Sequence, residues 1–217
     1  MSLRAKICGL TTPEAVKAAV RAGASYIGFV FYEKSPRNIS PKRAAELAAK
    51  IPASVTICGV FVNPSDEQLK ATLDHISLNL IQLHGQESPQ RCQEIKNRFK
   101  RPVMKAIAVT TAEDIAVAKA YENTADILLF DAKPAADQKE ALPGGNGLRF
   151  DWHLMKGQQW NMPWMLSGGL DADNLEAAAA ISGAAIFDVS SGVENHPGAK
   201  SIPKINAFMT IITKDNI

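Results

Sequence analysis

The sequence has few cysteines and histidines, and their spacing argues against a disulfide framework and against a zinc site. Three cysteines are present, Cys8, Cys58 and Cys92; they are widely spaced and form no Cys-x-x-Cys pair. An odd number of scattered cysteines does not make a disulfide framework, so we expect free thiols. None of the four histidines lies three or four residues from another histidine or a cysteine, as zinc ligands often do. We therefore expect no bound metal.

The chain also lacks an excess of one charge and any long apolar run. Its 24 basic and 22 acidic residues are scattered and give a net charge of +2. This balance predicts no nucleic-acid partner and no membrane partner, although a small anionic ligand would suit it. No apolar stretch approaches membrane-spanning length, and none follows the basic residues Arg4 and Lys6 at the N-terminus. A cytoplasmic protein is expected.

No stretch of the sequence resembles a linker with a change of composition on either side. The chain has 217 residues, of which 46% are hydrophobic and 21% are charged, as in ordinary globular proteins. This length is enough to bury a substantial core in one domain. We therefore predict a single domain over residues 1–217.

A capping residue followed by proline recurs at nearly even spacing and predicts helix starts. Proline suits the first helical position because its missing N–H would be unpaired there, and the preceding side chain can cap the first turn. Ser65 offers an alternative cap for the third start. Further starts are expected at Thr110-Thr111-Ala112-Glu113, which has capping-box spacing, and near Asp151, Asp171 and Ser201. The four motifs are Thr12-Pro13, Ser40-Pro41, Asn63-Pro64 and Ser88-Pro89.

A short apolar or β-branched run precedes each of these starts, so the chain alternates strand and helix. Runs with little polar alternation are typical of parallel strands that are covered on both faces. The pattern predicts strand followed by helix, repeated eight times. The eight runs are Ala5–Cys8, Tyr26–Phe31, Val55–Val62, Leu78–Leu83, Val103–Ala108, Ile127–Phe130, Trp164–Leu166 and Ala185–Val189.

Eight such units favour an α/β fold of the closed (β/α)₈ TIM-barrel type over an open doubly wound sheet. A nucleotide-binding open sheet would usually carry G-x-G-x-x-G in its first strand–helix turn, and that turn has only Gly9. The Gly-Gly pairs occur late in the chain. In a barrel, the ends of strands seven and eight commonly hold a phosphate.

Chemistry in such a barrel is expected where strands end at the mouth. Cys8 ends the first strand, and Lys6, on the same strand face, would favour its thiolate; the alternative is that Cys8 is a small buried hydrophobe. Asp131 directly follows the sixth run, where it suits a general acid or base; the alternative is that it forms a turn. Arg37 could clamp a carboxylate bidentately, or be a solvated loop charge. Lys105 is a further candidate at the mouth.

Glycine and serine at two late strand ends predict a phosphate site. Backbone amides there can approach an anion without interference from a Cβ, although each segment alone could be an ordinary turn. The segment 132–146 is longer than most such loops and suggests a lid or binding loop. Gln82 and His84 are possible substrate contacts. The phosphate candidates are Gly168, Gly169, Ser190, Ser191 and Gly192.

Taken together, these segments resemble the signature segments of phosphoribosylanthranilate isomerases of tryptophan biosynthesis. The match runs from the first strand to the eighth in the right order, which makes the set far more specific than any member. The segments are Lys6–Gly9, Gly28–Phe31, Ser35–Arg37, Gly59–Asn63, Gln82–Gly85, Gly144–Gly147, Phe150–Trp152, Leu166–Leu170 and Asp188–Glu194.

The resemblance implies a cofactor-free Amadori rearrangement of a phosphosugar substrate, the small molecule that we expect as partner. It gives Asp131 the role of general acid, Cys8 that of general base and Arg37 that of carboxylate ligand. Lys6 and Gly145 are implied as possible substrate contacts. We expect a monomer rather than a homodimer. Two alternatives stay open: a related barrel that also isomerises the histidine-pathway aminoaldose, and a non-catalytic phosphosugar-binding barrel.

Overall fold

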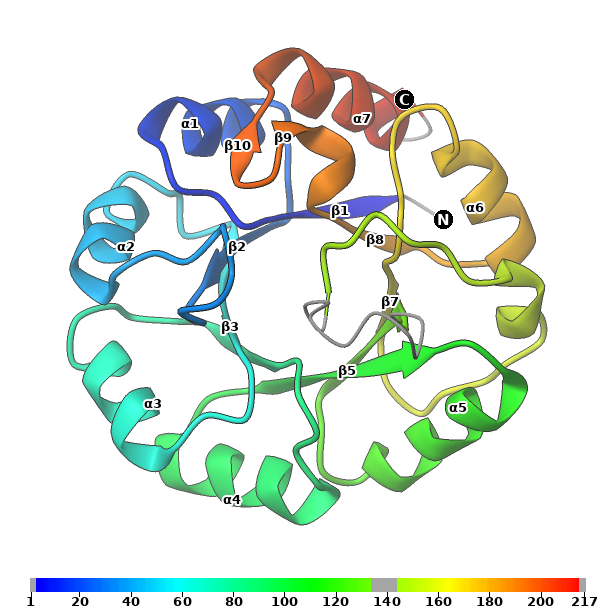
Figure 1. The fold of residues 1–217 in the computed structure, drawn as a ribbon, viewed down its shortest axis with the longest axis horizontal. Helices are drawn as coiled ribbons and strands as arrows, with labels where there is room; N and C mark the ends of the chain where they lie inside the picture. Colours follow the sequence, from blue (N-terminus) through cyan, green and yellow to red (C-terminus); the bar gives the residue numbers. More distant parts are fainter. Residues whose placement is uncertain (1–2, 134–143, 215–217) are drawn as a thin grey trace.

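The expected strands lie side by side in chain order and close into a barrel (Figure 1). The computed structural model describes residues 3–133 and 144–214. Each strand pairs in parallel with the next, and β8 pairs with β1, which confirms the predicted (β/α)₈ barrel. The strands are β1 (Arg4–Cys8), β2 (Tyr26–Val30), β3 (Thr56–Phe61), β4 (Leu80–Leu83), β5 (Val103–Val109), β6 (Ile127–Ala132), β7 (Trp164–Leu166) and β8 (Ile186–Val189).

Helices form an outer ring around the sheet in Figure 1. A short antiparallel hairpin, β9 (Glu194–His196) and β10 (Ala199–Lys200), follows β8. The described residues also contain three 3₁₀ turns, namely η1 (Ala118–Tyr121), η2 (Trp152–Met155) and η3 (Ser191–Val193). The helices are α1 (Pro13–Arg21), α2 (Pro41–Ala48), α3 (Asp66–Leu73), α4 (Pro89–Phe99), α5 (Ala112–Val117), α6 (Leu175–Ser182) and α7 (Ile202–Lys214).

Three of the four capping motifs start their helices as predicted. The side chains of Thr12, Ser40 and Ser88 each accept a hydrogen bond from the amide three residues on, with proline next in the chain. The third helix starts at the alternative cap, Ser65. Asn63 does not cap it, because this residue is left-handed at φ 47° and its side chain accepts from the Gln86 amide instead.

The prediction of eight strand–helix units is wrong for the sixth. Between β6 and β7 the described residues hold only the turn η2, capped by Asp151, and no α-helix. Gly157, at φ 76°, takes the chain out of this turn, because a left-handed residue ends a helical run. The predicted start near Asp171 is also displaced: Asp171 accepts two amide hydrogen bonds in a turn, and α6 begins after Asn174.

Strand alternation divides the side chains into two layers. Alternate residues, such as Ile7 and Phe29, pack outward in the large core between the sheet and the helices. Their neighbours point into the barrel, where the lower interior is a separate small cluster. That cluster is filled by Cys58, Leu80, Met104, Ala106, Leu129, Met165 and Ile186. The lower interior of the barrel is therefore packed rather than open, and the pocket described below lies at its mouth.

The same alternation removes Lys105 from the mouth, so the expectation for this residue is wrong. Lys105 lies between Val103 and Ile107, which both belong to the outer core. Its Nζ is buried and bonds the Glu87 carboxylate at 2.9 Å and the Gly85 carbonyl at 2.7 Å. Lys105 therefore ties the β4 loop to the outside of the sheet.

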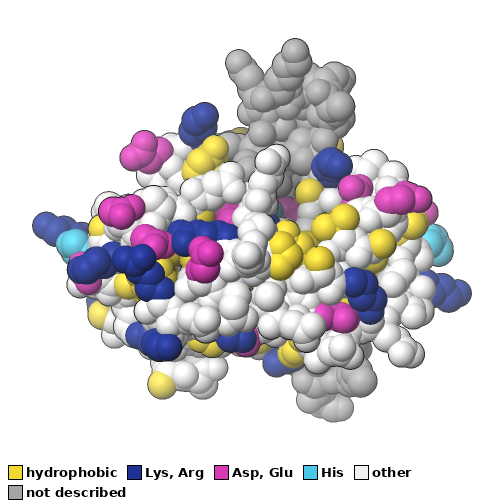
Figure 2. Space-filling model, turned by 90° about the horizontal axis from the view of Figure 1, so that it is seen from below, with side chains coloured by type: hydrophobic (Ala, Val, Ile, Leu, Met, Phe, Trp, Pro, Cys, Tyr) yellow, Lys and Arg dark blue, Asp and Glu magenta, His cyan; other side chains and the backbone are white. Residues whose placement is uncertain are grey.

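Charges of both signs are interspersed on the face that Figure 2 shows. Among the charged groups of the protein surface, Asp66 pairs with Arg91 at 2.6 Å and also with Arg98. Within residues 3–133 and 144–214, no helix has the length and apolar character to cross a membrane.

Candidate active site

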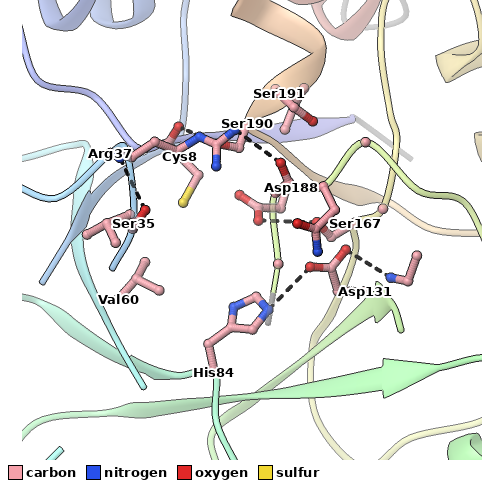
Figure 3. Close-up of a pocket in the computed structure, with 18 of the residues that line it drawn as sticks. Cys8, Ser35, Arg37, Val60, His84, Asp131, Ser167, Asp188, Ser190 and Ser191 are labelled. Atoms are coloured by element: carbon pink, nitrogen blue, oxygen red, sulfur yellow. Dashed lines mark hydrogen bonds and ion pairs between the residues drawn. The ribbon is translucent and has the colours of Figure 1, made fainter. Parts of the chain in front are cut away.

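A pocket opens at the carboxyl ends of the barrel strands and collects most of the candidate residues (Figure 3). The strand ends bring side chains from both halves of the chain to one mouth, as expected for this fold. Of the residues singled out from the sequence, those that line it are Cys8, Arg37, Gln82, His84, Asp131, Gly145, Gly168, Gly169, Ser190 and Ser191.

Besides Lys105, two further candidates, Lys6 and Gly192, do not line the pocket. Lys6 is fully buried below Cys8, and the β1–β8 register places it beside Asp188, with which it pairs at 2.9 Å. Gly192 lies in η3, where its Cα faces the Leu170 carbonyl so closely that a side chain would overlap it. Neither the Lys6 side chain nor Gly192 reaches the pocket.

Cys8 ends β1 with its sulfur directed into the pocket (Figure 3). Gly28 on the neighbouring strand provides the room, since a Cβ there would stand 2.9 Å from the sulfur. Burial raises the pKa of the Cys8 thiol; the Lys6 ammonium lowers it, and Asp188 opposes Lys6. Lys6 thus favours the thiolate, as expected, but burial acts in the opposite direction. Desolvation exceeds the effect of an ammonium that Asp188 already pairs.

Asp131 lies across the pocket from Cys8, next to His84 (Figure 3). It is 5% exposed, and its Oδ1 accepts the Ala132 amide at 2.9 Å. Its Oδ2 is 3.2 Å from His84 Nε2. The Gln82 amide nitrogen lies 2.8 Å from His84 Nδ1, and donation there leaves the proton of a neutral imidazole on Nε2, facing Asp131. Gln82 and His84 thus orient the Asp131 carboxyl.

Arg37 reaches the mouth from the loop after β2 and is held by protein groups. Nε and Nη2 each lie 2.8 Å from a Glu194 carboxylate oxygen, and Nη2 also donates to the Gly145 carbonyl at 3.1 Å. Glu194 therefore occupies the Nε–Nη2 edge of the guanidinium, and the carboxylate clamp expected from the sequence stays a prediction. These contacts leave Nη1 unused.

Gly145 has to be glycine for two physical reasons. Its φ is 76°, a conformation that side chains disfavour, and a Cβ there would collide with Nη1 of Arg37. Residues 134–143, most of the predicted long loop 132–146, lie outside the described residues.

The two late glycine segments lie side by side because β7 and β8 pair. Gly168 and Gly169 are left-handed, at φ 91° and 60°, and the Gly169 carbonyl accepts from Arg149 Nε at 3.1 Å. Ser190 Oγ donates to the Cys8 carbonyl at 3.1 Å. Backbone amides at adjacent loops of this kind suit an anion.

Asp188 and Glu194 were given no role from the sequence, and Lys200 was missed. Asp188 lines the pocket, pairs with Lys6 and accepts from Ser167 Oγ at 3.4 Å. Lys200 Nζ lies 2.6 Å from Glu194 Oε1. A sequence signal for Lys200 was the Pro197-Gly198 turn, which folds residues 194 and 200 against each other.

A family model described as N-(5′-phosphoribosyl)anthranilate (PRA) isomerase matches residues 5–210 of this chain. The chain belongs to this family. It is therefore an isomerase with the barrel fold that the resemblance implied.

Among the residues that the structure describes, no cluster of three or more His, Cys, Asp or Glu could hold a metal ion.

Curated relatives in the PRA isomerase family cover nearly the whole chain. The N-(5′-phosphoribosyl)anthranilate isomerase of Parvibaculum lavamentivorans is 50% identical over 209 residues, covering 96% of this chain and 97% of its own. The protein of the same name from Paracoccus denitrificans is 49% identical over 213 residues, covering 98% of both chains.

Solved PRA isomerase structures have the same architecture. The Thermotoga maritima enzyme superposes with a TM-score of 0.86 at 35% identity, covering 98% of this chain and 99% of its own. Another, with a TM-score of 0.82 at 33% identity over the same shares, is a complex with reduced 1-(o-carboxyphenylamino)-1-deoxyribulose 5-phosphate. A further T. maritima structure, with a TM-score of 0.81 at 34% identity over the same shares, describes monomers generated from a dimeric enzyme. The expectation of a monomer here thus stays a prediction.

Proposed function

We propose that this chain converts N-(5-phosphoribosyl)anthranilate into 1-(2-carboxyphenylamino)-1-deoxyribulose 5-phosphate in tryptophan biosynthesis, without a cofactor. The observation that carries the proposal is the placement of a thiol and a carboxyl on opposite sides of one pocket, Cys8 on β1 and Asp131 on β6. An aldose–ketose rearrangement needs an acid and a base at neighbouring atoms of one sugar. The family membership supports this reaction over others that such a pair could perform.

In the proposed reaction, Asp131 acts first, as general acid. A proton from its carboxyl passes to the ribose ring oxygen, the C1′–O bond breaks, and the anilino nitrogen supplies the electron pair that forms the C1′=N bond. The ring opens to an imine cation. His84, 3.2 Å from Oδ2, orients the carboxyl and can return a proton to it.

Cys8 acts second, as general base. Its thiolate takes the proton from C2′, the C2′–H electron pair forms the C1′=C2′ bond, and the imine π electrons move to nitrogen. The enolamine then becomes the aminoketose as C1′ gains a proton and the C2′ hydroxyl loses one. Lys6 contributes through Cys8, because it is the strongest influence that lowers the pKa of the thiol.

The proposed phosphate site lies at the ends of β7 and β8. Amides of Gly168, Gly169, Ser190, Ser191 and Gly192 are the proposed donors, since the loops that carry them adjoin each other around the pocket. Backbone amides suit a dianion because they need no reorganisation when the ligand arrives.

Arg37 is the proposed ligand of the anthranilate carboxylate. Arg37→Ala is expected to weaken binding of the reduced product analogue roughly 10- to 100-fold, as loss of a charge-assisted hydrogen bond does. Calorimetric titration measures this loss, and Arg43→Ala, which removes an arginine 45% exposed on α2 that pairs with Glu46, is the matched control. An unchanged affinity in Arg37→Ala would contradict the assignment.

One assay separates the proposed function from its alternatives. Freshly made phosphoribosylanthranilate and the histidine-pathway aminoaldose are supplied in parallel, and product formation is followed. Turnover of the first alone supports the proposal, turnover of both identifies the dual-substrate type, and binding without turnover identifies a non-catalytic barrel. Sedimentation of the same sample tests the proposed monomer.

A further inference from the structure

The β9–β10 hairpin places two charged side chains directly behind Arg37. The Glu194 carboxylate accepts hydrogen bonds from four donors on two sides. Oε1 receives Arg37 Nε at 2.8 Å and Lys200 Nζ at 2.6 Å. Oε2 receives Arg37 Nη2 at 2.8 Å and the Gly198 amide at 3.3 Å. These bonds hold Glu194 ionised, and its pKa is lowered although burial acts the other way.

All three side chains are removed from solvent. The exposed fraction is 5% for Arg37, 3% for Glu194 and 2% for Lys200. Within residues 3–133 and 144–214, Glu194 is the only carboxylate that pairs with either cation. Two cations and one anion leave the trio with one positive charge. A buried charge without a counter-ion is costly, so a site of this kind is suited to bind an anion.

We propose that Lys200 is a positioning residue for a substrate carboxylate. Its ammonium offsets the negative charge of Glu194, so that the three side chains around Arg37 together keep one positive charge for that carboxylate. The inference rests on the proposed function, in which Arg37 receives the anthranilate carboxylate.

Glu194 and Lys200 have complementary effects on Arg37. Glu194 fixes the guanidinium plane through two parallel bonds, which leaves Nη1 as the nitrogen not engaged by Glu194 or Gly145. Such ordering spares the ligand the entropy of immobilising a long side chain. The same carboxylate would, by itself, cancel the arginine charge and repel a second carboxylate. Lys200 removes that repulsion from behind, where it also bonds the Ser190 carbonyl at 3.0 Å.

The charge of Lys200 should matter for one kind of ligand and not for another. We compare reduced 1-(2-carboxyphenylamino)-1-deoxyribulose 5-phosphate with its carboxamide counterpart, which has nearly the same shape and keeps the phosphate. Lys200→Met is expected to weaken binding of the carboxylate ligand about tenfold or more, as loss of a close charge does. Binding of the carboxamide should change by no more than about twofold, because a neutral group interacts much more weakly than a carboxylate with the charge of Lys200.

A second variant tests charge balance against packing. Lys200→Met combined with Glu194→Gln again leaves one net positive charge, that of Arg37, and is expected to recover most of the lost carboxylate affinity. Lys200→Arg keeps the charge and should bind the carboxylate ligand like the wild type. Lys204→Met is the matched control, because Lys204 is exposed and, among the residues that the structure describes, bonds the backbone carbonyl of Glu194 at 2.7 Å and no carboxylate.

The outcomes are distinguishable by titration. Loss confined to the carboxylate ligand in Lys200→Met, with recovery in the double variant, supports the inference. Equal losses of affinity for both ligands, without recovery in the double variant, would show that Lys200 has a structural role and would overturn the inference. An unchanged affinity in Lys200→Met would overturn it as well. If the wild type binds neither ligand, the proposed function itself fails, and this inference fails with it.

Discussion

Replacing Cys8 by alanine is expected to lower kcat by about 10²- to 10⁴-fold, the usual contribution of a positioned general base. The barrel should stay folded, because Cys8 belongs to a small cluster at the mouth rather than to the main core. Binding of the reduced product analogue should change little, since the thiol is assigned to the C2′ proton and to no ligand charge. Steady-state turnover and calorimetric titration measure the two effects.

Cys92→Ala is the matched control for this substitution. Cys92 is also buried but lies in α4, outside the barrel and away from the pocket. Its variant should turn over like the wild type. Near-wild-type turnover in Cys8→Ala would remove the thiol from the mechanism and leave the base unassigned.

The Cys8 thiol should also set the pH dependence of the reaction. Burial raises its pKa above the ordinary value, so the thiolate is a minor species near neutrality and increases with pH. While the pH stays below that pKa, kcat/KM is expected to rise by up to about tenfold per unit. A flat profile between about pH 6 and 8 would show that the thiolate is not the limiting base.

Asp131→Asn is expected to lower kcat by about 10²- to 10⁴-fold, because the amide cannot protonate the ring oxygen. Asparagine has the same shape and keeps an oxygen for the Ala132 amide, so the fold and the ligand affinity should be largely retained. Turnover against calorimetric affinity separates chemistry from binding here too.

The control for Asp131 removes one carboxylate from the same end of the barrel. Asp173 lies in the loop after β7, away from the pocket, and Asp173→Asn should leave turnover unchanged. Comparable losses in both variants would indicate a general effect of charge at the mouth, and the acid role of Asp131 would have to be given up.

The fold was largely predictable because its signals are local. A capping serine such as Ser88, followed by proline, specifies a helix start wherever it occurs, and a run such as Ile127–Phe130 specifies a buried strand. The sixth unit was mispredicted because Asp151 caps a turn and an α-helix in the same way. The residues after the cap decide between the two, and Gly157 ends this turn early.

The site was only partly predictable, because it depends on pairings between distant residues. Strand ends indicated Cys8 and Asp131, which line one pocket in the structure. The partner of Lys6 is Asp188, 182 residues later, and only the closure of the barrel brings them together. The raised pKa of Cys8 follows first from burial, and Asp188 adds to it by opposing Lys6. Glu194 and Lys200 were hidden for the same reason, since their relation to Arg37 exists only after folding.

The connection between β6 and β7 has a consequence for spectroscopy. All three tryptophans of the chain lie in it or directly after it: Trp152 and Trp160 precede β7, and Trp164 is the first residue of that strand. Trp160 and Trp164 pack around Phe130 on β6, at 5.2 and 5.8 Å between ring centroids, one residue before Asp131. Intrinsic indole fluorescence therefore originates entirely from one side of the barrel, and it can follow events near the acid without a label.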